Sequence, residues 1–156
     1  MVILNQAMRE TTASWNEREV DLEERFAWLA EKRIRGYPVL VARRDGSVLG
    51  YATFGPFRSF DGYRRTVENS VYVRPELHRQ GVGRRLLEAL IARARAQRLH
   101  RMVAGIEAGN AASIALHASL GFTETGRLPE VGAKFGRWLD LVLMQLALDE
   151  AERPPA

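Results

Sequence analysis

Cysteine is absent from the 156 residues, which excludes disulfides, thiolate metal sites and a cysteine nucleophile. The three histidines, His78, His100 and His117, lack the close spacing of a metal site. No apolar run approaches the ~18 residues that a membrane-spanning helix needs, and the N-terminus lacks the basic-then-apolar pattern of a signal peptide. We therefore expect a cytoplasmic protein with no metal ion and no membrane partner.

The composition is that of an ordinary globular protein, with 46% hydrophobic and 27% charged residues. A chain of this length is long enough to bury roughly two thirds of the surface that its unfolded form exposes. We expect residues 1–156 to form one domain, with a frayed tail from about residue 150 that includes Arg153-Pro-Pro-Ala156.

The formal net charge of +4 is unevenly distributed. Seven arginines and one acid, Glu88, lie between Arg79 and Arg101. A basic surface of this kind attracts nucleic acid or a small molecule that carries several phosphates. The sequence has no zinc finger and no pattern of stacking aromatic residues, so we expect the phosphate-bearing small molecule and no nucleic acid.

Secondary-structure signals predict an α/β protein. Segment 1–10 forms a helix that breaks at Thr11-Thr12, and the second helix, 21–35, has apolar residues at 22, 26, 29 and 30. Two strands joined by an Asp-Gly turn come next, and strands then alternate with helices. This order predicts a mixed sheet with helices on both faces. The remaining expected elements are a long loop at 55–65, strands at 37–42, 47–54, 66–73, 102–106, 122–126 and 139–148, helices at 81–98 and 110–120, and a loop or irregular extension at 127–136.

A glycine-rich loop, Arg79-Gln-Gly-Val-Gly-Arg84, connects the strand at 66–73 with the helix that follows. Glycines at 81 and 83 lack the Cβ atoms that would keep a ligand from the backbone, and helix N-termini attract anions. The spacing matches neither the nucleotide P-loop nor the dinucleotide fingerprint. Two interpretations follow from the residues, a phosphate site or a tight turn before a helix.

Residues 71–87 resemble the acyl-CoA-binding motif of the GNAT superfamily of N-acetyltransferases, and residues 110–122 are similar to its second signature. The resemblance implies a mixed, mostly antiparallel sheet and acetyl-CoA as co-substrate. It also implies that the fold opens with a strand that is missing here, and we expect that strand upstream of Met1. The cofactor-binding residues implied by the resemblance are Val71, Tyr72, Val73, Arg79, Gln80, Gly81, Val82, Gly83, Arg84, Asn110 and Ser113.

Segments 12–17, 50–55, 68–73 and 132–140 resemble a narrower branch, the phosphinothricin and methionine sulfoximine N-acetyltransferases. The resemblance implies a homodimer and a small amino acid analogue, with a free α-amino group and a carboxylate, as substrate. Phe135 stands where some phosphinothricin enzymes have histidine, which favours methionine sulfoximine or methionine sulfone.

Acyl transfer to an amine needs a base that removes a proton from the ammonium form. Glu68 occupies the position at which the narrower branch has its base. The alternative is an exposed strand carboxylate that pairs with Arg64 or Arg65. His117 stands where many GNAT enzymes have a tyrosine that protonates the departing thiolate, and the residues leave open whether it is an acid or a packing histidine.

An arginine is suited to bind the substrate carboxylate, and Arg58 matches the substrate loop of the branch. A surface charge is the alternative for Arg58. The resemblance places Lys134 near the substrate, across a dimer interface. The other residues implied to bind substrate are Ser59, Phe60, Glu68, Asn69 and Ser70.

Two other functions remain open from the sequence. One is a GNAT enzyme that acetylates a protein N-terminus or a polyamine, although residues 57–65 contain three arginines and only Asp61 as an acid. The other is a non-catalytic, acyl-CoA-binding regulatory module. A glutamate at the base position argues against that module.

Overall fold

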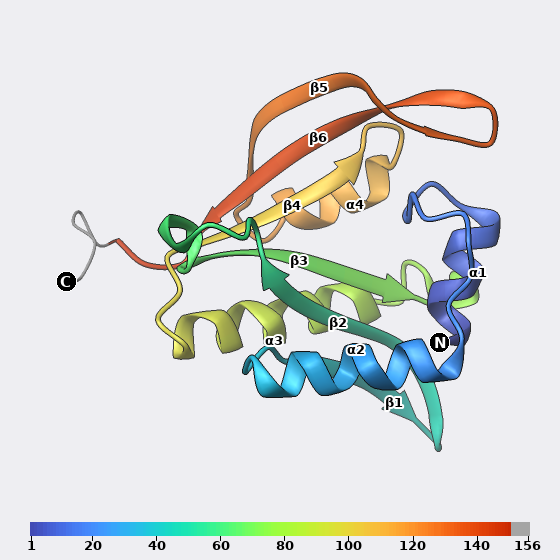
Figure 1. Ribbon diagram of the computed structural model, residues 1–156, viewed down its shortest axis with the longest axis horizontal. Helices are drawn as coiled ribbons and strands as arrows, with labels where there is room; N and C mark the ends of the chain where they lie inside the picture. The colour runs from blue at the N-terminus through green and yellow to red at the C-terminus, as the bar shows by residue number, and fades with distance from the viewer. Residues whose placement is uncertain (151–156) are drawn as a thin grey trace.

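The computed structural model describes residues 1–150, and the expected tail at 153–156 lies outside them. In this range four α-helices surround one six-stranded sheet (Figure 1). The helices are α1 (Val2–Glu10), α2 (Leu22–Ile34), α3 (Val82–Ala96) and α4 (Ala111–Ala118). The strands are β1 (Val39–Arg44), β2 (Ser47–Pro56), β3 (Thr66–Val73), β4 (Arg101–Glu107), β5 (Thr123–Lys134) and β6 (Arg137–Ala147).

The strand order is β1-β2-β3-β4-β6-β5, and only the β3–β4 pair is parallel. This confirms the expected mixed, mostly antiparallel sheet. Among the described residues no strand precedes α1, and β1 forms one edge of the sheet. An added strand upstream of Met1 remains a prediction.

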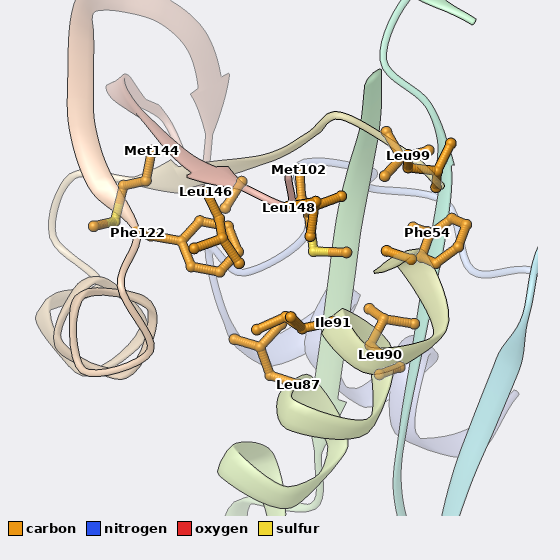
Figure 2. Close-up of a cluster of buried hydrophobic side chains, with 14 of the residues drawn as sticks. Phe54, Leu87, Leu90, Ile91, Leu99, Met102, Phe122, Met144, Leu146 and Leu148 are labelled. Atoms are coloured by element: carbon orange, nitrogen blue, oxygen red, sulfur yellow. The ribbon is translucent and has the colours of Figure 1, made fainter. Parts of the chain in front are cut away.

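The main core lies between the sheet and helices α3 and α4. Leu87, Leu90 and Ile91 of α3 repeat at helical spacing and pack against alternate residues of the central strands (Figure 2). Burying each leucine stabilises the fold by about 1.5–3 kcal/mol. The buried side chains that the strands and their ends contribute include Phe54, Val67, Met102, Val142, Met144, Leu146 and Leu148. This packing holds α3 against strands β1, β2 and β3.

Helices α1 and α2 cover the opposite face of the sheet. Ile3, Leu4 and Met8 of α1 form a second cluster with Tyr51 of β2. The apolar face expected for α2 is wrong, because Leu22 and Phe26 are 56% and 63% exposed. The helix instead turns Trp28 and Lys32 inward, and the Lys32 ammonium donates to the Phe54 carbonyl at 2.8 Å. An aromatic side chain and the apolar stem of a lysine therefore provide contacts that the leucine and phenylalanine do not make.

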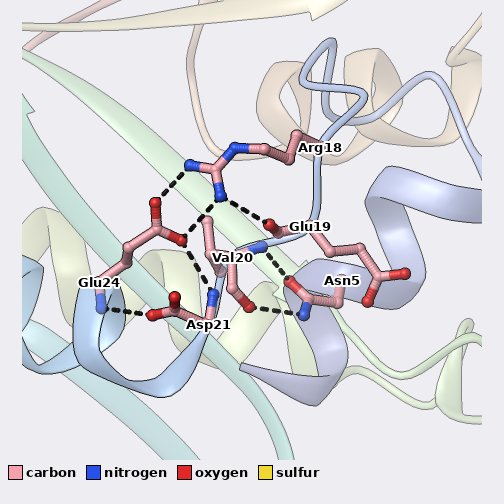
Figure 3. A network of polar contacts seen from close by, with 6 residues as sticks. All are labelled: Asn5, Arg18, Glu19, Val20, Asp21 and Glu24. Atoms are coloured by element: carbon pink, nitrogen blue, oxygen red, sulfur yellow. Dashed lines mark hydrogen bonds and ion pairs between the residues drawn. The ribbon is translucent and has the colours of Figure 1, made fainter.

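The connection between α1 and α2 is held by polar side chains (Figure 3). The Asn5 amide donates to the Val20 carbonyl at 2.9 Å and accepts from the Val20 amide at 3.2 Å. Asp21 and Glu24 form a reciprocal capping box at the start of α2. The chain between the two helices is thus anchored at its far end.

The stretch 127–136, expected as a loop or an irregular extension, is an irregular extension, because strand β5 continues up to Lys134. Pairing with β6 extends the strand across two register shifts, between Glu124 and Gly126 and between Leu128 and Gly132. Glu130 has a φ of 53°, and its amide donates to the Asp140 carboxylate at 2.9 Å. The irregularity is real, but bulges place it within a paired strand.

Candidate active site

A gap opens between the two parallel strands at the centre of the sheet. β3 and β4 pair only from Thr66–Glu68 to Arg101–Val103, and beyond that point β4 turns away from β3 (Figure 1). The backbone edge of β3 after Glu68 is therefore left without a strand partner on this side. A cavity of about 310 Å³ occupies the gap. It is lined by residues 12–16, 68–72 and 104–107 together with Asn110, Ser113, His117 and Leu141.

Glu68 lies in this gap, at the last pair before the strands separate. A Cβ atom on Gly105 would lie 3.0 Å from the Glu68 Oε1 atom, so a glycine in β4 makes room for the carboxylate. Burial raises the pKa of Glu68 above its ordinary value, and the positive charge of Arg58 acts in the opposite direction. A carboxyl group in this environment is suited to exchange protons nearer to neutral pH.

The alternative partners for Glu68 bind elsewhere. Arg64 donates to the Asp61 carbonyl at 3.4 Å, and Arg65 donates to the Arg98 carbonyl at 3.0 Å. Neither arginine forms an ion pair with Glu68 among the described residues. Burial raises the pKa of Glu68 and the positive charge of Arg58 lowers it, and no ion pair within residues 1–150 includes this carboxylate.

Arg58 is an exposed residue of the loop between β2 and β3. Its guanidinium lies 4.4 Å from the centre of the Phe57 ring and donates to the Phe57 carbonyl at 3.2 Å. Ser59 and Phe60 are also exposed, and neither lines the cavity. The structure thus brings Arg58 into electrostatic reach of Glu68 and leaves Ser59 and Phe60 outside the cavity wall.

His117 and Asn69 form a buried pair in the wall of the cavity. The His117 Nε2 atom lies 3.2 Å from Asn69 Oδ1, and Nδ1 lies 2.8 Å from the Ser113 carbonyl. Asn69 also donates to the Val103 carbonyl at 3.1 Å. Burial lowers the pKa of His117, and the hydrogen bond to Ser113 raises it. Both ring nitrogens of His117 have partners within the protein, which favours a packing histidine over an acid. The Asn69 side chain bonds to His117 and to β4. Asn69 and Ser70 both line the cavity.

The N-terminus of α3 has the geometry of a candidate anion cradle. Gly81 has a φ of 77° and caps the helix, and the first hydrogen bond of the helix runs from the Arg85 amide to the Gly81 carbonyl. The amides of residues 82–84 therefore have no acceptor inside the helix. A Cβ atom on Gly81 would meet no atom within 4 Å, whereas one on Gly83 would touch Leu116 and Val73. Gly81 keeps space open beside the amides, and Gly83 serves packing.

The residues around the N-terminus of α3 differ in backbone conformation and in hydrogen-bond partners. Arg79 adopts a φ of 61° and Gln80 donates to the Glu76 carbonyl at 3.2 Å. Arg84 pairs with Glu88 at 2.9 Å and donates to Ser119 at 3.1 Å. Asn110 caps α4 by accepting from the Ser113 amide at 3.1 Å. Free backbone at the β3 edge and free amides at α3 together fit a long acyl-CoA molecule with an anionic pyrophosphate.

Lys134 is not placed as a substrate ligand. Its side chain is 1% exposed, and its ammonium donates to the Thr11 carbonyl at 2.8 Å and to the Ser14 carbonyl. It does not line the cavity. Within one chain its donors are used by the backbone of the segment that follows α1, and the expected place of Lys134 near the substrate across a dimer interface stays a prediction.

Sequence reasoning assigned no role to that segment, or to Gly105 and Glu107 in β4. Residues 12–16 line the cavity, and the Thr12 hydroxyl donates to Glu107 Oε2 at 2.7 Å. The available signal was the Thr12-Ala-Ser-Trp-Asn-Glu17 motif itself, which resembled the narrower branch. Its place beside β4 depends on contacts 95 residues apart.

The described part of the chain, residues 1–150, contains no group of three or more histidine, aspartate or glutamate side chains that could hold a metal ion. None of its helices is both long enough and apolar enough to cross a membrane.

Known proteins resemble this chain over nearly its whole length. A Salmonella typhimurium protein named L-methionine sulfoximine/L-methionine sulfone acetyltransferase is 57% identical, over 99% of this chain and 90% of that protein. A solved Salmonella typhimurium acetyltransferase, in complex with its cofactor acetyl-CoA, has a TM-score of 0.96 at 57% identity and the same coverage. A Brucella melitensis structure described as a ribosomal-protein-alanine N-acetyltransferase has a TM-score of 0.92 at 55% identity, over 94% of this chain and 90% of that one.

The family comparison agrees with the geometry of the gap between β3 and β4. Residues 2–122 match the acetyltransferase (GNAT) family, and this range includes Glu68, the α3 cradle and α4. The chain belongs to the acetyltransferase (GNAT) family.

Proposed function

We propose that this enzyme transfers the acetyl group of acetyl-CoA to the α-amino group of a small amino acid analogue. Methionine sulfoximine and methionine sulfone are the proposed substrates, and phosphinothricin is a weaker one. The observation that carries the proposal is the Glu68 carboxyl group, which lies in the β3–β4 gap, has a raised pKa and is within electrostatic reach of Arg58.

The proposed chemistry assigns one role to each group. Acetyl-CoA supplies an activated thioester carbonyl. Glu68 accepts a proton from the ammonium of the substrate, either directly or through water, so that a neutral nitrogen attacks the thioester carbonyl. The carbon–sulfur bond then breaks, and CoA leaves as a thiolate that takes up the second proton lost by the amine nitrogen. Arg58, whose exposed guanidinium donates to the Phe57 carbonyl, pairs with the substrate carboxylate. The free edge of β3, Val71 to Val73, and the α3 amides hold the acyl-CoA.

The substrate class is supported by two lines of evidence. The Salmonella relative that is named for methionine sulfoximine and methionine sulfone is 57% identical to this chain. Phe135 also replaces the histidine of some phosphinothricin enzymes. The Brucella structure favours a second candidate, acetylation of a protein N-terminal alanine, because it is 55% identical. Three arginines in the 57–65 loop argue against a polyamine, which is cationic.

A panel of amines assayed with acetyl-CoA and detection of the released thiol tests this proposal. The panel contains methionine sulfoximine, methionine sulfone, phosphinothricin, spermidine and a peptide with N-terminal alanine. We expect kcat/KM to be highest for the first two compounds and lower for phosphinothricin. Acetylation of the peptide or of spermidine, without acetylation of any free amino acid analogue, would contradict it. Glu68→Gln measured in parallel separates enzymatic from spontaneous transfer.

The proposal includes a homodimer and a cytoplasmic location. The β5–β6 hairpin supports self-association, because it extends past the other strands (Figure 1) and exposes Val131, Phe135 and Trp138. Apolar side chains that are exposed together are typical of association surfaces.

A further inference from the structure

We infer that residues Thr11–Asn16, here named the 11–16 loop, are a fixed wall of the amine-binding end of the cavity, and that Lys134 is the positioning residue that holds it. The inference rests on the proposed function for its link to amine binding. Lys134 acts through the loop backbone and does not contact the substrate. Three contacts between the 11–16 loop and strands β4 and β5 support the inference.

The first contact is the Lys134 ammonium, at the end of β5. It donates to the Thr11 carbonyl at 2.8 Å and to the Ser14 carbonyl, which lie on either side of two residues that line the cavity. A side chain that is 1% exposed loses most of its hydration, and burial lowers its pKa. A buried ammonium is stable only where carbonyl or carboxylate oxygens replace water. The loop supplies those oxygens, so the loop conformation and the lysine depend on each other.

The second contact joins the loop to β4. The Thr12 hydroxyl donates to Glu107 Oε2 at 2.7 Å, while Glu107 Oε1 accepts from the Gly109 amide at 2.8 Å. A Cβ atom on Gly109 would lie 3.0 Å from that same carboxylate. Glu107 therefore fixes Thr12 relative to the turn that leads into α4.

The third contact is the Trp15 ring against the backbone of β5. A Cβ atom on Gly132 would lie 2.2 Å from the nearest carbon of the Trp15 ring, so only glycine leaves room for it. Gly132 pairs with Leu139 of β6, two residues before Lys134 in β5. The ring and the ammonium thus hold the loop from neighbouring positions of one strand.

The chain from Thr11 to Val20, which contains the 11–16 loop, is anchored at both ends independently of these three contacts. Thr11 caps the end of α1 through its hydroxyl, which donates to the Ala7 carbonyl at 2.8 Å. Asn5 holds Val20 at the other end (Figure 3). Loss of the Lys134 contact is therefore expected to loosen the loop between two fixed ends, without unfolding α1 or α2.

The loop and the phosphate cradle are separate parts of the site. Residues 12–16 line the cavity together with Glu68 and Ser70, whereas no residue of the 79–84 loop lines it. A loosened loop therefore raises KM for the amine and leaves KM for acetyl-CoA close to the wild-type value. A lysine that only stabilised the fold would change the free energy of unfolding on substitution. It would leave the ratio of the amine KM to the acetyl-CoA KM unchanged.

The experiment compares Lys134→Met with the matched control Lys32→Met. Lys32 is also a partly buried lysine whose ammonium donates to a backbone carbonyl, that of Phe54, and it lies outside the cavity. The measurements are hydrogen exchange of the 11–16 amides, KM for methionine sulfoximine and KM for acetyl-CoA. We expect faster exchange in the loop, unchanged exchange in α3 and a rise of about tenfold in KM for methionine sulfoximine in Lys134→Met only.

A second pair of variants covers the case in which Lys134→Met does not fold. Thr12→Val removes the hydroxyl that donates to Glu107, and Thr12→Ser keeps it. We expect a raised amine KM in the first and its rescue in the second. Unchanged loop exchange in a folded Lys134→Met or in Thr12→Val overturns the inference, and so does faster exchange with an unchanged amine KM. A wild-type enzyme that acetylates no amine contradicts the proposed function. The hydrogen-exchange comparison still tests whether Lys134 holds the 11–16 loop.

Discussion

At the scale of single residues, Glu68 and Gly105 illustrate how one side chain obtains its properties from another strand. The carboxyl group extends toward β4, where only a glycine leaves enough room for it. The same position removes it from water and raises its pKa. A raised pKa is useful in a base, because a base with a pKa nearer the working pH takes up protons more readily.

We predict that Glu68→Gln lowers kcat by about 10²–10⁴-fold, the range typical of general-base catalysis. Glutamine keeps the size of the side chain and cannot accept the proton. Because only the ionised form is active, wild-type kcat/KM should rise with pH through a midpoint above that of an ordinary glutamate. Steady-state kinetics across pH on both proteins checks this. A fall of less than about threefold at every pH would show that another group takes the proton.

Thermal melts of the same variant provide its control. The folded-state pKa of Glu68 is raised, so the native state binds more protons than the unfolded state between the unfolded and folded pKa values. The contribution of Glu68 to stability therefore falls as pH rises through that window. Glu68→Gln should melt at a higher temperature than the wild type at pH 8, and this advantage should disappear at pH 4. An equal or lower melting temperature at pH 8 would show that Glu68 is stabilised in its charged form.

At the scale of elements, the α3 N-terminus is formed by local sequence and positioned by packing. Gly81 caps the helix with a φ of 77°, and three amides of the first turn have no acceptor inside the helix because no helical turn precedes them. Leu87, Leu90 and Ile91 hold the helix against the sheet beneath it. The same helix is thus an anion cradle at one end and a part of the core along its length.

Gly81→Val is predicted to weaken acetyl-CoA binding by at least about tenfold, because a side chain enters the open space beside the amides. Gly46→Val is the matched control. Gly46 has a φ of 80° and also meets no atom within 4 Å, so it imposes the same backbone strain in the β1–β2 turn. Calorimetry should show weaker binding in the first variant only. Equal affinity in a folded Gly81→Val would place the pyrophosphate elsewhere.

At the scale of the whole molecule, the two halves of the sheet have different surfaces. The half formed by β1, β2 and β3 is covered by α1 and α2 on one face and by α3 on the other. The β5–β6 hairpin lies at the opposite edge and leaves Phe135 and Trp138 55% and 68% exposed. The burial of such side chains in a second copy of the chain is the reason for the proposed homodimer.

Trp138→Glu is therefore predicted to convert a dimer into a monomer. A carboxylate at a buried apolar contact is costly, whereas at an exposed position it costs little. Sedimentation velocity of the wild type and the variant measures the assembly, and Phe26→Glu on the exposed face of α2 serves as the control. A wild-type monomer at micromolar concentration, or a dimer that Phe26→Glu and not Trp138→Glu dissociates, would contradict the proposed surface.

Local signals in the sequence were enough to predict much of the fold. The Asp45-Gly46 turn, the cap at Asn110 and the glycine at 81 each depend on residues within four positions, and all three have the expected conformation. Such features depend on backbone sterics and short-range hydrogen bonds, which a sequence pattern specifies directly. The resemblance to a known family added the mixed, mostly antiparallel character of the sheet, and the role of Glu68 as the base stays a prediction.

Tertiary structure alone decided which groups face one another. Strand β5 continues past Leu128 because β6 pairs with it, and Lys134 binds carbonyls 120 and 123 residues away. The 11–16 loop becomes a cavity wall through Glu107, and α2 buries Trp28 where periodicity favoured Phe26. Each of these contacts joins distant parts of the chain, and their free energy depends on packing and desolvation in the folded state, which no local pattern of residues specifies.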